Sequence, residues 1–157
     1  MAVLIIVFCA ACSKEPELSA APTSAPTVPA AEETPALFSI GDSVVIDEVI
    51  LTYVDNCVGW QNYLSILPPK EGYQYVQATF EVEYTGEFSA HVSHIEFSCY
   101  ADDYECEYVY QGIGDMSATL SSGRKSTGSV FFLVPLEATE IEIEYHHDGE
   151  IAIFKVQ

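Results

Sequence analysis

The sequence predicts an all-β fold, an antiparallel sandwich of two sheets, preceded by a segment that does not fold with it. Apolar and polar residues alternate with a period of two from residue 40 onward, which is the period of a half-buried strand. The candidate strands are short and bounded by Gly, Pro or Asp, and no helix of ordinary length is predicted. Because two amphipathic sheets bury their apolar faces against each other, residues 37–157 are expected to form one sandwich.

The first segment, residues 1–11, is apolar and carries no charge. It is too short to cross the roughly 30 Å hydrocarbon layer of a membrane as a helix, and it fits the apolar region of a signal peptide. No Lys or Arg precedes it, so we expect the true start to lie upstream. Ala10, Ala11 and Cys12 resemble the lipobox of bacterial lipoproteins, whose cysteine is diacylated.

Cys12 is therefore the predicted lipidation site, and residues 12–36 are the predicted tether. Five prolines and no aromatic residue lie between residues 13 and 36, so this stretch cannot bury enough apolar surface to fold. Two or more acyl chains anchor a protein stably to a bilayer. We expect an extracytoplasmic protein anchored to the cell membrane; the alternative is an ordinary secretory signal with incidental cysteines.

Alternation is clearest in residues 75–85, YVQATFEVEYT, which predict one long strand. Its alternate residues are expected to face the core, namely Val76, Ala78, Phe80, Val82 and Tyr84. Residues 139–145 repeat the pattern with Ile141, Ile143 and Tyr145 inward. Further strands are predicted at 43–54, 93–100, 104–110, 129–134 and 150–156. The connection 55–72 is long for a compact domain and predicts a short strand or a binding loop.

Charge excludes several classes of partner. Residues 37–157 contain 20 acidic residues against four Lys or Arg, which leaves 16 net negative charges. Nucleic-acid backbones are bound by Lys and Arg, so no nucleic-acid partner is expected. Anionic lipid headgroups and anionic wall polymers would be repelled. The charge favours cations, basic peptides or neutral molecules.

Four stretches together indicate a family. They are LSSGRKSTGSVFFLVP at 120–135, IGD at 40–42, EGYQYVQATFEVEYTG at 71–86 and FSCYADDYECEYVY at 97–110. They resemble an immunoglobulin-like domain of unknown function, number 4352, found mostly in exported lipoproteins of Gram-positive bacteria. The resemblance implies an immunoglobulin-like sandwich outside the cell, and it implies no activity, catalytic residue or ligand.

Three cysteines, Cys57, Cys99 and Cys106, lie in the region expected to fold, in a compartment that permits disulfides. A two-residue turn at Asp102 and Asp103 would place Cys99 opposite Cys106 as a hydrogen-bonded pair. Disulfides suit the closer non-bonded pairs better, and a four-residue turn would place the two cysteines in such a pair. Cys57, in the long connection, is therefore an equal competitor for Cys99, and three reduced thiols are the remaining alternative.

Two groups of residues are candidate metal ligands. His146 and His147 precede Asp148 in a predicted turn and could join an acidic side chain to bind Zn²⁺ or Cu²⁺. Asp102, Asp103 and Glu105 place oxygen ligands of the kind that Ca²⁺ prefers close together in sequence. The alternatives are a solvated hairpin end for the first group and an acidic turn for the second.

Trp60 and Tyr63, in the long connection, are candidate ligand-binding residues, because Trp and Tyr offer flat, amphipathic area at low entropy cost. Packing beneath the loop is the alternative. No catalytic motif is present, so no enzyme and no cofactor are expected. We expect a binding or interaction module for an unknown protein or glycan; the alternatives are a small-ligand or metal-ion binder and a purely structural envelope component.

Overall fold

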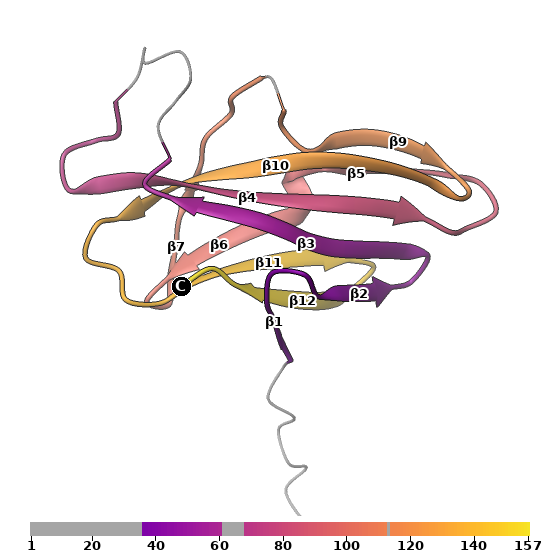
Figure 1. The fold of residues 1–157 in the computed structure, drawn as a ribbon, viewed down its shortest axis with the longest axis horizontal. Helices are drawn as coiled ribbons and strands as arrows, with labels where there is room; N and C mark the ends of the chain where they lie inside the picture. Colours follow the sequence, from indigo (N-terminus) through magenta and orange to yellow (C-terminus); the bar gives the residue numbers. More distant parts are fainter. Residues whose placement is uncertain (1–35, 61–67, 113) are drawn as a thin grey trace, which may run out of the picture. The chain divides into compact units, whose positions relative to one another are not determined.

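The structure, a computed structural model, describes residues 36–60, 68–112 and 114–157, all within one compact unit. Its strands form two five-stranded sheets and a two-stranded ribbon. In these ranges there is no α-helix, and so none with the length and apolar character needed to cross a bilayer. Figure 1 shows the two sheets stacked on each other, which confirms the predicted all-β sandwich. The predicted signal segment, Cys12 and Tyr63 lie outside the described residues.

The two sheets have different strand orders. The first sheet has the order β1-β12-β11-β6-β7, with strands β1 (Leu37–Phe38), β6 (Phe97–Ala101), β7 (Tyr104–Glu105), β11 (Ile141–His147) and β12 (Glu150–Lys155). The second has the order β2-β3-β4-β10-β8, with strands β2 (Ser43–Ile46), β3 (Val49–Val58), β4 (Tyr73–Tyr84), β8 (Glu107–Tyr108) and β10 (Arg124–Pro135). All their pairs are antiparallel except β1 with β12. The ribbon joins β5 (Ser89–Ser93) to β9 (Ser117–Ser121).

The core lies between the sheets and is filled by alternate residues of the long strands. The five residues of β4 predicted to face inward are all buried, as are the three of β11. Phe80 of β4 lies 5.1 Å from Tyr53 of β3, and 5.0 Å each from Phe97 of β6 and Phe154 of β12, between ring centroids. Since buried aromatic rings contribute large apolar areas, this cluster holds the two sheets together.

Three predicted strands are divided in the structure. Residues 43–54 form the β2–β3 hairpin, whose turn begins at Asp47 with a φ of 51°. The segment 93–100 contains the 3₁₀ helix His94–Glu96, and the carboxylate of Glu96 accepts a hydrogen bond of 2.8 Å from the amide of Ser93. The segment 104–110 changes sheet, because β7 pairs with β6 and β8 pairs with β10.

The long connection begins as a strand. β3 continues to Val58, with a bulge between Tyr53 and Asp55, so the short strand predicted after residue 54 is an extension of β3. Residues 61–67 lie outside the described ranges. The strands β5 and β9, which the alternation did not predict, pair with each other over five residues.

Candidate functional site

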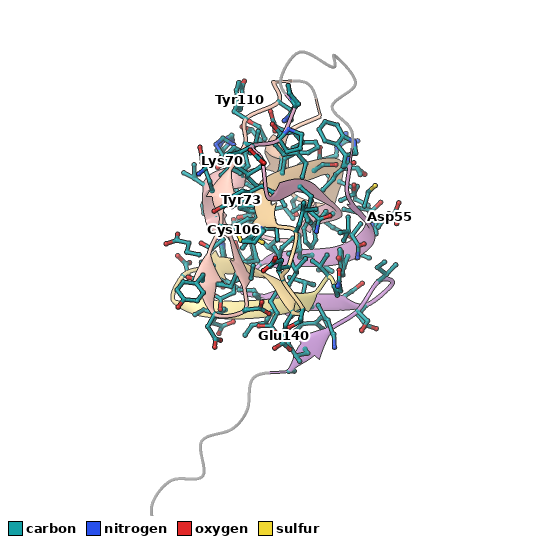
Figure 2. The ribbon with its side chains drawn as sticks, turned by 90° about the vertical axis from the view of Figure 1, so that its left-hand side faces the viewer. Asp55, Lys70, Tyr73, Cys106, Tyr110 and Glu140 are labelled. Atoms are coloured by element: carbon teal, nitrogen blue, oxygen red, sulfur yellow. The ribbon has the colours of Figure 1, made fainter. Side chains whose placement is uncertain are left out.

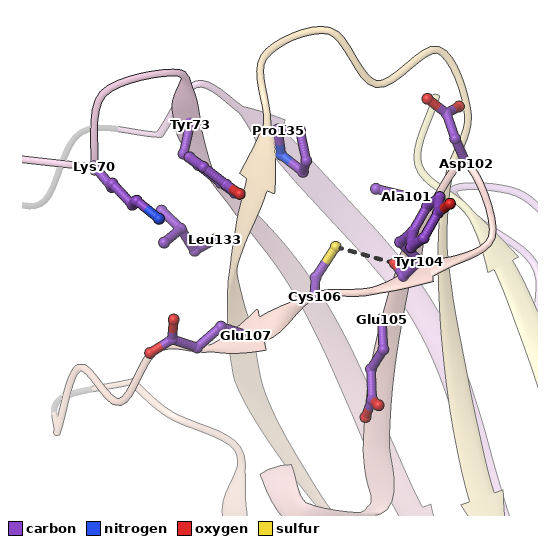
Figure 3. A pocket seen from close by; sticks show the side chains of 10 residues that line it. All are labelled: Lys70, Tyr73, Ala101, Asp102, Tyr104, Glu105, Cys106, Glu107, Leu133 and Pro135. Carbon is purple, nitrogen blue, oxygen red and sulfur yellow. Dashed lines mark hydrogen bonds between the residues drawn. The ribbon is translucent and has the colours of Figure 1, made fainter.

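A cleft of about 500 Å³ lies at one end of the sandwich, where the chain passes from the first sheet to the second. Figure 2 shows Lys70, Tyr73 and Cys106 on this side of the molecule. Figure 3 shows the thiol of Cys106 and the hydroxyl of Tyr73 pointing into the cleft. The lining residues are Lys70, Tyr73, Ala101, Asp102, Tyr104, Glu105, Cys106, Glu107, Leu133 and Pro135.

The β6–β7 hairpin positions Cys106 in this cleft. Its two-residue turn at Asp102 and Asp103 is present as predicted, and both residues have positive φ, 47° and 69°, as a type I′ turn requires. The Asp102 carboxylate accepts hydrogen bonds from the Glu140 amide and from the hydroxyl and amide of Thr139. These bonds, that of the Glu140 amide foremost, hold the pKa of Asp102 below the ordinary aspartate value. The turn is thereby tied to the β10–β11 connection.

Cys99 and Cys106 face each other across the hairpin. The Cys106 amide donates a hydrogen bond of 2.8 Å to the Cys99 carbonyl oxygen, as expected for a hydrogen-bonded pair. Cys99 is buried and Cys106 is partly exposed; both are thiols in the structure. Interaction with the neighbouring Cys106 thiol, together with burial, raises the pKa of Cys99, whereas interaction with Cys99 lowers the pKa of Cys106, whose Sγ atom lies 3.7 Å from the Tyr104 carbonyl oxygen. The sulfur that loses its proton more readily is therefore the one in the cleft.

Cys57 lies on the far side of the second sheet from this pair. The β3–β4 register sets Cys57 beside Gln77, whose amide donates a hydrogen bond of 3.0 Å to the Ser129 hydroxyl on the outer face of the sheet. Cys99 faces the core beside Ile143. The second sheet thus stands between Cys57 and Cys99, whereas Cys106 is in contact with Cys99.

Aromatic residues continue from the cleft along the outer face of the second sheet. The Trp60 ring packs 4.9 Å from Phe131 and 6.3 Å from Tyr75, between ring centroids. In the β4–β10 register, Tyr75 pairs with Leu133, which lines the cleft. Phe131 and Leu133 are two residues apart on one strand, so they share a face at a spacing of about 7 Å. Trp60 therefore lies on a row of apolar side chains that leads into the cleft.

The cleft combines aromatic rings with acidic groups. The Lys70 Nζ atom lies 5.1 Å from the centre of the Tyr73 ring, within the range of cation–π attraction. Tyr104 is 78% exposed, so its ring is accessible. Glu105 and Glu107 stand on either side of Cys106. These groups can hold a cationic side chain against an aromatic face with carboxylates nearby.

The structure divides the acidic residues that were candidate calcium ligands. Glu105 lines the cleft, whereas Asp103 lines a second groove of about 250 Å³ on the first sheet. Asp102 borders both, and its carboxylate is occupied by backbone and hydroxyl donors. The second groove is lined by Tyr100, Asp102, Asp103, Glu140, Glu142 and Glu144. Burial, and then the charges of its neighbouring glutamates, raise the pKa of Glu142.

The other end of the sandwich carries the candidate histidines. β4 extends from Tyr73 in the cleft to Tyr84, a span of roughly 36 Å, so the two ends are well separated. His146 and His147 do not act together: the Nε2 atom of His146 lies 3.0 Å from Glu144, whereas the Nδ1 atom of His147 lies 3.0 Å from Glu96. Neighbouring residues of a strand point to opposite faces, which explains this separation.

His147 instead meets a residue that the sequence did not indicate. Ligand atoms of Asp47, His147 and Asp148 lie within 4.8 Å of one another. Across the ranges that the structure describes, this is the one such group of three His, Cys, Asp or Glu side chains. The β2–β3 turn supplies Asp47 and the β11–β12 turn supplies Asp148, and these two residues are 101 positions apart in sequence.

The comparison with protein families gives a match whose residues include both ends of the sandwich. The family described as Domain of unknown function (DUF4352) matches residues 38–152. The chain belongs to this family. The resemblance drawn from the sequence motifs is therefore confirmed, and the matched DUF4352 region contains the cleft and the residues around His147. The comparison with curated proteins gives no match.

Solved structures share the fold of this DUF4352 chain. The ycdA protein of Bacillus subtilis strain 168, a candidate lipoprotein, has 14% identity and a TM-score of 0.61 over 73% of this chain and 38% of its own length. The yjhA protein of Bacillus subtilis has 18% identity and a TM-score of 0.60, over 77% of this chain and 100% of its own. MPT63, a secreted protein of Mycobacterium tuberculosis, has 18% identity and a TM-score of 0.54, over 78% and 98%.

Proposed function

We propose that the chain is a lipid-anchored, extracytoplasmic binding module without catalytic activity, and that its cleft binds a basic peptide segment of an envelope protein. The cleft around Cys106 carries this proposal. A volume of about 500 Å³ matches ordinary ligand pockets. Its wall provides tyrosine rings, apolar side chains and carboxylates, which together suit the methylene stem and the charged end of Lys or Arg.

The charge of the folded region supports a basic partner. Its 16 net negative charges attract cationic segments over a distance and repel the anionic polymers of an envelope. Lys70 beside Tyr73 already displays the expected contact, a cation against an aromatic face. A neutral glycan could use the row of aromatic side chains through Trp60 and donate hydroxyl hydrogen bonds to the carboxylates, but it would not compensate their negative charge.

The proposed location outside the cytoplasm is based on the N-terminal segment. Cys12 with its preceding alanines resembles a lipobox, and residues 13–36 would hold the domain clear of the bilayer. Two proteins of similar fold are described as a candidate lipoprotein and as a secreted protein. Both descriptions agree with this location.

We also propose that Cys99 and Cys106 form a disulfide after export. In this step the two thiols lose two protons and two electrons to a thiol oxidant, itself a disulfide, of the exporting compartment. Their contact across the hairpin and the lowered pKa of Cys106 favour attack by the Cys106 sulfur. The bond would fix one wall of the cleft.

Trp60 is the single tryptophan of the chain, so its fluorescence can report binding. Full-length protein in detergent is titrated with a nonapeptide rich in Lys and Arg, and with the same peptide carrying Glu at those positions. We expect saturable binding of the basic peptide, weakened by salt because the charges are exposed, and none of the acidic peptide. Binding of both peptides alike would contradict the proposal.

Variants locate the site. Tyr104→Ala is expected to weaken binding about two- to five-fold, the value of an exposed cation–π contact, and Glu107→Gln to reduce the salt dependence. Phe88→Ala is the matched control, because Phe88 and Tyr104 are both 78% exposed and Phe88 lies outside the cleft. If Phe88→Ala weakens binding as much as Tyr104→Ala, the site is not the cleft.

A further inference from the structure

Two turns from opposite sheets converge on one histidine. Asp47 opens the β2–β3 turn of the second sheet, and Asp148 follows His147 in the β11–β12 turn of the first. Each aspartate is exposed and adopts positive φ, 51° and 46°. With His147 they offer two carboxylates and one imidazole within 4.8 Å of one another. Such a set combines one nitrogen ligand with two oxygen ligands.

His147 is held in the orientation and tautomer of a metal ligand. Its Nδ1 atom lies 3.0 Å from the Glu96 Oε1 atom, and an ionised carboxylate can only accept, so Nδ1 carries the proton. The neutral ring then has its lone pair on Nε2. The other oxygen of Glu96 accepts the Ser93 amide at 2.8 Å, so Glu96 is itself fixed. A carboxylate that orients a histidine in this way is the usual second partner of metal-bound imidazole.

A second observation at the same place points to a ligand. The hydroxyl of Tyr145 is buried without a hydrogen-bond partner, and its side chain is 0% exposed. The Tyr145 ring is stacked on the His147 ring, with 5.9 Å between the ring centroids, so this side chain lies beside the cluster. Buried polar groups in folded proteins nearly always find a partner. The unpartnered hydroxyl therefore belongs to the side chain that lies beside the candidate ligand His147, on the same face of β11.

We propose that Asp47, His147 and Asp148 bind a divalent transition-metal ion of the Zn²⁺ type, with Glu96 as the residue that positions His147. Imidazole together with carboxylate suits Zn²⁺ better than Ca²⁺, which takes oxygen ligands alone. Three protein ligands leave a fourth position to water, as in open zinc sites. The proposed zinc site is separate from the peptide cleft, so the failure of either proposal would not contradict the other.

Isothermal titration of Zn²⁺ into the full-length chain, in detergent and with any affinity tag removed, tests the proposal. Cysteine thiols elsewhere in the chain also bind zinc. The result is therefore the difference in Zn²⁺ bound per chain between each variant and the wild type. His147→Gln is expected to take up one Zn²⁺ less per chain than the wild type. His146→Gln is the matched control, because His146 neighbours His147 but pairs with Glu144 on the other face, and it is expected to bind as the wild type does.

Two further variants separate the roles of the residues. Asp47→Asn and Asp148→Asn each remove one charged ligand, and Asn tolerates the positive φ of both positions, so these variants keep the turns. Glu96→Gln is expected to weaken zinc binding about 10- to 100-fold, the usual effect of losing a residue that orients a ligand. The melting temperature of the Glu96→Gln variant, measured without zinc, is the check that this variant is folded.

The proposal is overturned if His147→Gln takes up as much Zn²⁺ as the wild type, or if His146→Gln loses the same single ion. It is also overturned if Ca²⁺ binds at this cluster and binding survives His147→Gln, because the imidazole is then not a ligand. Unchanged affinity in folded Glu96→Gln would remove the positioning role of that residue.

Discussion

A methyl group added to Gly128 of β10 would lie 2.8 Å from the Cα atom of Met116. Gly128 is buried, and Met116 is 0% exposed and bonds through its amide to the Ser129 carbonyl oxygen at 2.8 Å. The backbone that leads into β9 therefore passes directly over β10 at this glycine. A side chain at position 128 would have to displace main chain rather than a flexible side chain.

Gly128→Ala is expected to lower the free energy of unfolding by about 1–3 kcal/mol, the usual cost of overpacking a core. Urea denaturation measures it. Thr127→Ala, at the exposed neighbouring position, is the control and is expected to change stability by less than about 1 kcal/mol. Equal effects of the two substitutions would show that the close approach of Met116 carries no cost.

Reduction of protein isolated from its host is expected to lower its stability by about 2 kcal/mol, because the proposed disulfide between Cys99 and Cys106 would close a short loop. Urea midpoints with and without reductant give the difference. Cys106→Ser should abolish the dependence on reductant, whereas Cys57→Ser should leave it unchanged. The reverse result would establish the pairing of Cys57 with Cys99.

Asp102→Asn is expected to flatten the loss of stability in acid. Since the folded pKa of Asp102 is lowered, its contribution is complete above the unfolded value of about 3.9 and is lost as the pH falls through the folded value. Asn tolerates the positive φ at this position and can still accept from Thr139. Urea midpoints from pH 6 to pH 2 should show the stability difference between wild type and variant narrowing. If the stability difference between wild type and variant stays constant from pH 6 to pH 2, titration of Asp102 does not cause it.

Cys12→Ser is expected to abolish incorporation of labelled palmitate in the native host and to release the protein from the membrane fraction. Cys9→Ser, which changes the other cysteine of the same segment, should leave both unchanged. Labelling of Cys12→Ser at the wild-type level would refute the predicted anchor.

Sequence periodicity predicted the elements in which one face of the strand is buried along its whole length. In β4 the residues from Val76 to Tyr84 alternate without interruption, and each of the predicted inward positions is buried. A two-residue turn at Asp102 and Asp103 was one of the two alternatives that the sequence offered, because acidic residues favour turns between strands. The fold class followed from these local signals alone.

The features that sequence reasoning missed depend on partners distant in the chain. At Cys106 the chain passes from the first sheet to the second, because β7 pairs with β6 and β8 pairs with β10. Strands of two residues are too short to show a hydrophobic period, so the sequence did not predict this change. Asp47 meets His147 through the stacking of two turns. The Asp148-Gly149 pair signalled its turn, but no local signal indicated which residues would lie opposite.

Each sheet ends in a strand of two or four residues, β1 and β7 in the first and β2 and β8 in the second. The remaining edge of β10 is bonded by backbone groups of Val109, Gly114 and Met116. Long unpaired margins are what allow separate molecules to join strand to strand into aggregates. Two copies that join through the terminal strands could therefore extend a sheet by a ladder of only two to four residues.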